Sequence, residues 1–319
     1  MSMLERIAES LFWIGRYTER AENHARLLDV YYHLREESDA SGDTVWKRIA
    51  EAIGDTALYE ERHEAYRERD VIHFLTLDTA QGNSLLCCVS HARDNLKKIR
   101  EQLPAELWNL MNGFYLWLKS VKLDEVLQDS PHGFFQKVKE GLAAFQGTAV
   151  SIVVRDESWH LMEIGRYLER SENIVRLLQS VRRTLPDSKE SSYGYTMALL
   201  KSVGGAEAFR RLGLVEMSLE EVCRFLVLQE TFPRSVQFAI ASFENRLKSL
   251  RGQADKSGSE LERVIRLAGK TRSELGWLER HDLTLDNLDS VLQQLLSSNR
   301  QLGDAMDKYF FSPGREVTA

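Results

Sequence analysis

Residues 14–28 of the chain read IGRYTERAENHARLL, and residues 164–178 read IGRYLERSENIVRLL. The two stretches agree at 11 of 15 positions, at a constant offset of 150 residues. Self-similarity at a fixed offset indicates an internal repeat. The apolar residues recur at helical spacing in both copies, so the repeat predicts two related amphipathic helices.

The resemblance between the two copies continues beyond these helices. At the same offset Gly54 corresponds to Gly204, and further on an offset of 151 aligns Ser84 with Ser235. Both offsets carry apolar positions of one copy onto apolar positions of the other. Two stretches of about 150 residues therefore share one helical plan.

The chain is long enough for one large domain or two ordinary ones. No linker rich in Gly, Ser or Pro lies near residue 150, and long helices with polar faces need partners against which to bury their apolar side. We therefore expect one domain over residues 1–319, built from related halves at about 1–150 and 151–319. The expected fold class is an all-α, internally duplicated, pseudo-two-fold helical bundle.

Composition supports a helical protein and narrows its partners. Of the 319 residues 43% are hydrophobic and only five are proline, which suits a sizeable helical core. The net charge of −6 argues against a nucleic-acid partner, because such proteins usually carry a basic surplus. The charged N-terminus and the lack of a long apolar run predict a cytoplasmic protein without a membrane span. The three cysteines lack metal-ligand spacing, and we expect them and the tryptophans in the core.

Turn and capping residues divide the rest of the chain. We expect the turn Gln81–Ser84 before a helix, a further helix opened by Pro104, a break at Pro131, and the second half beginning near Thr148. Helices are expected over 2–35, 44–53, 58–69, 73–77, 85–102, 134–145 and 260–311, with a loop over 185–193 and a polar tail over 312–319.

The polar face of the repeated helix is its most constrained part. On a helical wheel one sector holds Arg16, Glu19, Arg20, Asn23 and Arg26, with Glu22 at its edge. Every one of these residues recurs in the second copy, as Arg166, Glu169, Arg170, Asn173, Arg176 and Glu172. A solvated face tolerates substitution at a cost within about half a kcal/mol, so such a face drifts readily. This face has not drifted, which indicates a constraint on it.

Two interpretations of that constraint stay open. In the structural one, which we favour, the arginines pair with Glu19 and Glu169, along each helix or across to the other copy, and fix the register of the bundle. In the functional one, the arginines and the asparagines of both copies form a cleft for an anionic ligand, such as a phosphate or a peptide carboxylate. One of the two glutamates would then act as a base, if its pKa were raised.

Other site chemistries find less support in the sequence. Di-iron bundles use Glu-x-x-His pairs, whereas the motif here reads Glu19-x-x-Glu22, so we expect no metal at it. The chain contains no GxxxxGK[ST] phosphate loop, no HExxH helix and no GxSxG elbow, and we expect no cofactor.

Three motifs relate the chain to a known family. The dipeptide Glu19-Arg20 lies within LFWIGRYTERAENHARLLDV and returns as Glu169-Arg170. The tracts VIHFLTLDTAQGNSLLCCVSHARDNLKKIREQLPAELWNLMN and FLVLQETFPRSVQFAIASFENRL follow in order. On these motifs nearly the whole chain resembles the bacterial alpha-E family, all-helical proteins named for an ER motif. It departs from the family at Gly82, where a proline-containing turn is more usual.

The resemblance implies a function that the residues alone do not. Members of the family tend to be encoded beside circularly permuted ATP-grasp proteins and transglutaminase-like proteases. It thus implies an accessory or scaffold subunit of a peptide-ligating or peptide-modifying system, with the ATP-grasp protein as partner and the protease as a second candidate. The alternative is an enzyme that acts on a carboxylate- or phosphate-bearing peptide at the polar cleft. A free-standing structural dimer is a third reading, and the oligomeric state is left open.

Overall fold

The structure is a computed structural model that describes residues 3–34, 42–53, 56–128, 130–184, 193–213, 217–252, 258–278 and 280–311. Within these ranges the regular elements are all helices, which confirms the all-α class. They are α1 (Met3–Leu34), α2 (Gly42–Ile53), α3 (Thr56–Glu60), α4 (Glu68–Thr76), α5 (Leu85–Lys98), α6 (Ala105–Ser120), α7 (Leu123–Leu127), α8 (Pro131–Ile152), α9 (Glu157–Thr184), α10 (Tyr193–Ser202), α11 (Ala206–Arg211), α12 (Leu219–Leu228), α13 (Val236–Ser249), α14 (Gly258–Trp277) and α15 (Leu285–Met306). Single turns of tighter or wider helix occur at Leu250–Gly252, Arg280–Asp282 and Asp307–Phe311.

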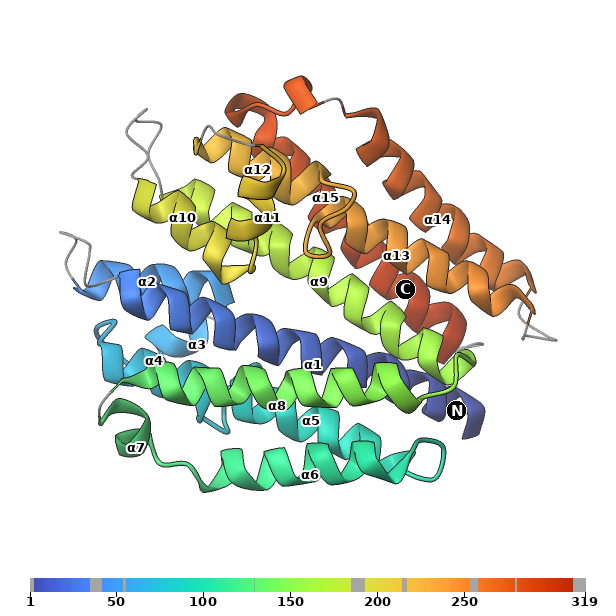
Figure 1. Ribbon diagram of the computed structural model, residues 1–319, viewed down its shortest axis with the longest axis horizontal. Coiled ribbons are helices and arrows are strands. Elements are labelled where there is room, and N and C mark those ends of the chain that lie inside the picture. Colours follow the sequence, from blue (N-terminus) through green and yellow to red (C-terminus); the bar gives the residue numbers. More distant parts are fainter. Residues whose placement is uncertain are drawn as a thin grey trace.

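The two repeated helices, α1 and α9, run side by side through the middle of the bundle (Figure 1). Helices α5 and α8 pack against α1, with α6 outside them, and helices α13 and α15 pack against α9, with α14 outside. In addition, α2 of the first half packs against α9, and α10 of the second half packs against α1. The two halves therefore interlock. That they arose by duplication stays a prediction from the sequence.

Helix α1 is buried on both of its faces. Ile14 and Leu28 on the apolar face are almost fully buried, and so are Phe12 and Leu27, which lie within the polar sector. A helix that is apolar on several sides belongs in the interior of a bundle, and α1 occupies that place. The polar sector is therefore set among buried residues.

Two glycines bring the backbones of α1 and α9 into contact. A Cβ atom on Gly15 would lie 2.0 Å from the carbonyl oxygen of Met162, and one on Gly165 would lie 2.0 Å from that of Phe12. Neither position has room for a side chain, because the obstacle in each case is backbone. The glycine of the IGRY sequence is thus required in both copies by the same close approach.

Capping residues place several helix ends where the sequence predicts them. The hydroxyl oxygen of Ser84 accepts from the backbone N–H of Cys87, and that of Ser235 accepts from Phe238, so the two aligned serines cap α5 and α13. Gly204 follows α10 with φ of +66°, the left-handed conformation that commonly ends a helix. Its counterpart Gly54 lies outside the described residues.

Several expected elements have other boundaries. The helix expected over 58–69 is interrupted by a turn over 61–67, and the one expected over 85–102 ends at Lys98. A break precedes α8 as expected, but Pro131 belongs to the helix and not to the break. It is the first residue of α8, where a missing N–H is tolerated, and α8 continues to Ile152, beyond the expected start of the second half.

The C-terminal segment and two core assignments also differ from expectation. The helix expected over 260–311 is broken between α14 and α15. Trp277, expected in the core, is 84% exposed at the end of α14. Of the cysteines, Cys88 and Cys223 are buried as expected, whereas Cys87 is partly exposed.

Candidate functional site

The ER motifs of α1 and α9 bind each other. Arg170 donates from Nε to Oε1 of Glu19 at 2.8 Å and from Nη2 to Oε2 at 2.6 Å. Reciprocally, Arg20 donates from Nε to Oε1 of Glu169 at 2.6 Å and from Nη2 to Oε2 at 3.0 Å. Both contacts are bidentate guanidinium–carboxylate pairs, called forks below, and this geometry adds directional specificity to charge attraction. Each motif thus supplies the glutamate for one pair and the arginine for the other.

A second guanidinium group also contacts the carboxylate of each ER glutamate. Arg16 donates from Nε to Oε2 of Glu169 at 2.6 Å and from Nη2 to Glu172 at 2.7 Å. On the other side this place is taken by Arg234, whose Nη1 lies 3.2 Å from Oε1 of Glu19. Its Nη2 donates to Oε1 of Glu22 at 2.5 Å. The local pairs between Arg16 or Arg20 and Glu19 that the sequence allowed give way to these contacts.

Arg166 does not take the role that its counterpart Arg16 has. Arg166 donates to Oε2 of Glu163 at 2.6 Å, within its own helix. The residue aligned with Glu163 is Trp13, whose ring lies 5.6 Å from the guanidinium carbon of Arg16. An aromatic ring offers no acceptor strong enough to hold a guanidinium in place, so Arg16 reaches across to α9. The two copies therefore differ in the partner of this arginine.

The outer edge of the cluster consists of two i,i+4 pairs, one in each motif helix. Arg26 donates from Nε to Glu22 at 2.8 Å, and Arg176 donates from Nη2 to Glu172 at 2.7 Å. The Arg26 and Arg176 side chains are 30% and 49% exposed, more than those of the inner arginines. These two guanidiniums are the ones that solvent reaches most easily.

Amides have unequal roles in the cluster. The side chain of Asn83, in the turn before α5, accepts from Nη1 of Arg20 at 2.7 Å. Asn23 is buried, and Nδ2 of Asn173 is buried without a hydrogen-bond partner among the described residues. Nη1 of Arg170 donates to the carbonyl oxygen of Pro233 at 3.1 Å.

Two members of the cluster, Asn83 and Arg234, were not among the residues predicted from the sequence. A signal for them was present, because the offset of 151 that aligns the capping serines Ser84 and Ser235 also aligns these two residues. The turn with the unusual Gly82 therefore does contact the ER motif, through its asparagine.

The electrostatic balance keeps both ER glutamates ionised. Each is only 2% exposed. Burial by itself raises the pKa of each carboxyl, but the facing arginines more than reverse this. Arg170 and Arg234 hold the pKa of Glu19 at about 2, and Arg16 and Arg20 hold that of Glu169 at about 2. This is the opposite of the raised pKa that the reading of Glu19 or Glu169 as a base requires.

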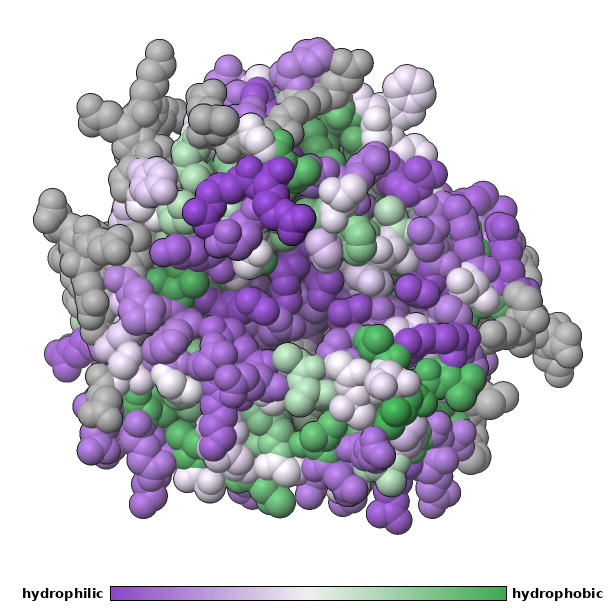
Figure 2. Space-filling view, in the orientation of Figure 1, coloured by the Kyte–Doolittle hydropathy of each residue, from purple (hydrophilic) through white to green (hydrophobic). Residues whose placement is uncertain are grey.

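The cluster as a whole carries an excess of positive charge. Six guanidiniums face four carboxylates, a surplus of two: they are Arg16, Arg20, Arg26, Arg170, Arg176 and Arg234 against Glu19, Glu22, Glu169 and Glu172. Figure 2 shows hydrophilic residues gathered in a hollow at the centre of the face on which α1 and α9 are seen in Figure 1. Such a surplus suits an anionic group at the exposed edge of the cluster.

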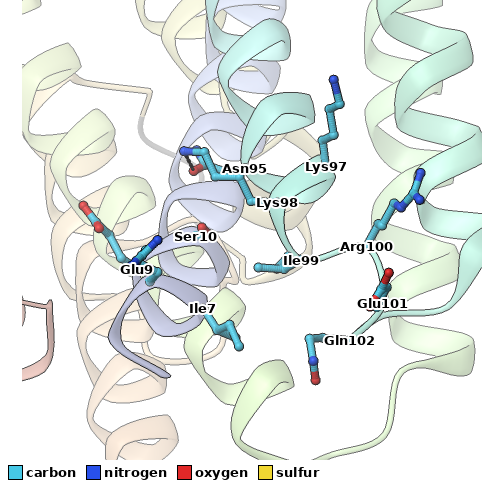
Figure 3. Close-up of a pocket in the computed structure, with 11 residues that line it drawn as sticks. Ile7, Glu9, Ser10, Asn95, Lys97, Lys98, Ile99, Arg100, Glu101 and Gln102 are labelled. Atoms are coloured by element: carbon cyan, nitrogen blue, oxygen red, sulfur yellow. Dashed lines mark hydrogen bonds between the residues drawn. The ribbon is translucent and has the colours of Figure 1, made fainter. Parts of the chain in front are cut away.

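Cavities among the described residues also lie away from the motif, two of them at the α1–α5 and α14–α15 contacts. The larger, about 650 Å³, lies between the N-terminal part of α1 and the end of α5. Figure 3 shows Ile7 and Ile99 facing this space, whereas Lys97 and Arg100 point away from it, so its basic side chains do not converge. The smaller, about 370 Å³, is largely apolar and lies between α14 and α15 beside Trp277. No residue of the repeated motif lines either cavity.

Comparison with known proteins identifies relatives of this chain and the family to which it belongs. The relatives of the chain include uncharacterized proteins of Mycobacterium bovis (Mb2597) and Mycobacterium tuberculosis (Rv2567), each 26% identical to it over 330 residues. The match covers 95% of this chain but 36% of each relative, so the chain spans about a third of their length. No solved structure matches the chain. Across the described residues, no helix combines the length and apolar character needed to cross a membrane. The family model described as "a predicted alpha-helical domain with a conserved ER motif" matches residues 3–311, and the chain belongs to this family, Alpha-E.

Proposed function

We propose that this chain is an accessory or scaffold module of an ATP-grasp-associated peptide-ligating or peptide-modifying system. In this proposal residues 3–311 fold as one unit, and the ER motif joins the two halves of that unit. The observation that carries it is the state of Glu19 and Glu169. Both carboxylates are buried, and guanidinium groups satisfy both oxygens of each.

The chemistry of such a carboxylate supports a structural role. With a pKa of about 2, Glu19 and Glu169 stay ionised at neutral pH and hold their hydrogen bonds rather than a substrate proton. A buried fork of this kind stabilises little by itself, because desolvation opposes the charge attraction. It does penalise any other register of α1 against α9, since a shift would leave buried charges unpaired. The unchanged polar face is accounted for in this way.

The lengths of the relatives support the proposal that this module works together with further polypeptide. In the mycobacterial proteins the matched region is about a third of the chain, so it is joined there to further polypeptide. A circularly permuted ATP-grasp protein is the partner that the family resemblance implies, and a transglutaminase-like protease is the second candidate. This chain would then position a partner, and the partner would supply the ATP chemistry.

Co-purification tests the scaffold role. The chain and the neighbouring ATP-grasp protein are co-expressed and separated by size-exclusion chromatography, with and without nucleotide. The proposal predicts a stoichiometric complex, and the absence of a complex at micromolar concentrations under both conditions contradicts it.

The variants Glu19→Gln and Glu169→Gln test the role of the motif itself. We expect both to lower the melting temperature, and to lower the activity of the reconstituted system only as far as they unfold the chain. The matched control is Glu207→Gln in α11, which removes a carboxylate that is 81% exposed and paired with Arg210. Loss of activity at an unchanged melting temperature would contradict the structural role and favour a site.

The charge surplus of the cluster favours one second candidate. In this alternative, an enzyme binds a carboxylate- or phosphate-bearing peptide at the outer guanidiniums, Arg26 and Arg176. Arg176→Gln is its test, because that side chain is half exposed and its loss costs little stability. The alternative predicts a large rise in KM for the anionic peptide at an unchanged melting temperature. The scaffold proposal predicts unchanged kinetics.

A further inference from the structure

A second polar cluster lies between α1 and α8, away from the ER motif. Asp29 and His33 stand one helical turn apart on α1, and His132 is the second residue of α8. Oδ1 of Asp29 lies 2.7 Å from Nδ1 of His132 and 3.9 Å from Nε2 of His33. The three atoms that could bind a metal ion all lie within 4.8 Å of one another.

These separations are close to those of a metal site. In a tetrahedral zinc site with bonds of about 2.0–2.1 Å, neighbouring ligand atoms lie about 3.3 Å apart. The distances of 2.7 and 3.9 Å bracket that value, so these ligand atoms already lie near the spacing of such a site. Two imidazole nitrogens and one carboxylate oxygen are donors typical of Zn²⁺ and other divalent transition ions, and not of Mg²⁺ or Ca²⁺.

Burial divides the cluster into a fixed and an accessible part. The Asp29 side chain is 7% exposed, whereas those of His33 and His132 are 53% and 52% exposed. An ion held by the three would therefore sit at the surface, with a further coordination position open to water. Three protein ligands and one open position form the arrangement of zinc sites that act on a bound molecule.

One cation already contacts the cluster. Nζ of Lys139, about two turns beyond His132 on α8, lies 2.7 Å from Oδ2 of Asp29. It engages the oxygen that faces away from the histidines and so leaves Oδ1 for an ion. Outer contacts of this kind orient a ligating carboxylate. The positive charge of Lys139 also opposes a second cation nearby, which limits the affinity.

We propose that Asp29, His33 and His132 bind one divalent transition-metal ion, with Zn²⁺ as the best match, and that this ion links α1 to α8. The second copy of the repeat has Gln179 and Arg183 at the positions of Asp29 and His33, so the repeat does not duplicate this site. The site is independent of the ER motif and of the function proposed for it.

Zinc titration tests the proposal. The full chain is titrated with Zn²⁺ against a chromophoric chelator, in a Cys87→Ser background that removes the partly exposed thiol. We expect one Zn²⁺ per chain, no binding of Mg²⁺, and a melting temperature raised by Zn²⁺. His33→Ala and His132→Ala should each weaken Zn²⁺ binding by at least roughly 10-fold. The control is His73→Ala, an exposed histidine on α4, which should bind as the parent does.

Lys139→Gln provides an independent arm of the test. The glutamine keeps an N–H donor for Oδ2 of Asp29 and removes the opposing charge, so Zn²⁺ binding should tighten several-fold, whereas a cluster that merely packs α1 against α8 gives no such gain. Both histidine side chains are about half exposed, and Asp29 keeps its contact with Lys139 in both variants, so the variants should keep the helical content of the parent. Equal Zn²⁺ affinity in the parent, His33→Ala and His132→Ala, or no binding in any of them, overturns the proposal.

Discussion

Replacing Glu19 by glutamine removes one negative charge from the centre of the cluster and keeps the shape of the side chain. In the variant Arg170 and Arg234 lose their shared carboxylate, and these side chains are 7% and 14% exposed. Arg234 retains Glu22, and Arg170 retains the carbonyl oxygen of Pro233. Neither contact restores the full charge balance, so we expect a substantial loss of stability.

The magnitude follows from two independent routes. Lowering the pKa of Glu19 from its ordinary value of 4.5 to about 2 means that the folded protein favours the ionised form by about 3 kcal/mol. Glutamine resembles the protonated form, so the variant should lose about that much. Breaking a buried ion pair by removing one partner costs about 3–5 kcal/mol in measured cases. We therefore expect about 3 kcal/mol or more at pH 7.

The dependence on pH gives this prediction its sharpest test. The folded-state pKa is lowered, so the stabilisation is complete above pH 4.5 and is lost as the pH falls towards 2. The difference in unfolding free energy between the parent and Glu19→Gln should shrink to about 1 kcal/mol at pH 3. Urea denaturation at pH 7, 5, 4 and 3 measures it, with Glu207→Gln as the exposed control. A difference below about 0.5 kcal/mol at pH 7 would refute the reasoning.

Two further predictions concern residues around the cluster. Gly15→Ala should destabilise the folded chain by about 3 kcal/mol or more, because the new Cβ would meet the carbonyl oxygen of Met162. Gly147→Ala, in open space on α8, should instead stabilise it by about 0.5–1 kcal/mol. Denaturant unfolding of both variants measures the difference, and equal effects would contradict the close approach of α1 and α9. Burial, and then the nearby Arg20, lower the pKa of His24 to about 3, so His24 stays neutral in the folded chain. The unfolded chain gains a proton at this residue as the pH falls, so the free energy of unfolding should fall by about 2 kcal/mol between pH 7 and pH 5. His24→Ile, which copies Ile174 of the second repeat, should lack this loss when melting is followed over that range, and an unchanged pH dependence would refute the assignment.

The membership of the ER cluster could largely be predicted from the sequence, because the repeat marks the residues that did not change. It singled out Glu19 and Arg20 with their second-copy partners, and these residues form the buried forks. The pairing across the helices could not be decided, since a wheel for one helix does not say what faces it. Gly15 illustrates the reason. A glycine in a helical pattern has the same spacing whether its Cα meets solvent or, as in this chain, another backbone.

Long-range contacts explain most of what the sequence left open. Arg234 lies 215 positions from Glu19, and no local pattern links the two. Arg16 and Arg166 occupy equivalent places in the repeat but have different partners, because the neighbouring residue is Trp13 in one copy and Glu163 in the other. Among helix boundaries, the start of α8 was expected three residues too late, because a proline that disrupts the interior of a helix is favoured in its first turn.

A double-mutant cycle between Glu19 and Arg170 tests most directly whether the ER motif is a fork that joins the two halves. Unfolding free energies are measured for the parent, Glu19→Gln, Arg170→Gln and the double variant at pH 7. Each single variant leaves a buried charge without its main partner, whereas the double variant removes both charges. We expect the double variant to be more stable than the sum of the single effects implies, with a coupling energy of about 2 kcal/mol or more. Additivity within about 0.5 kcal/mol would contradict it.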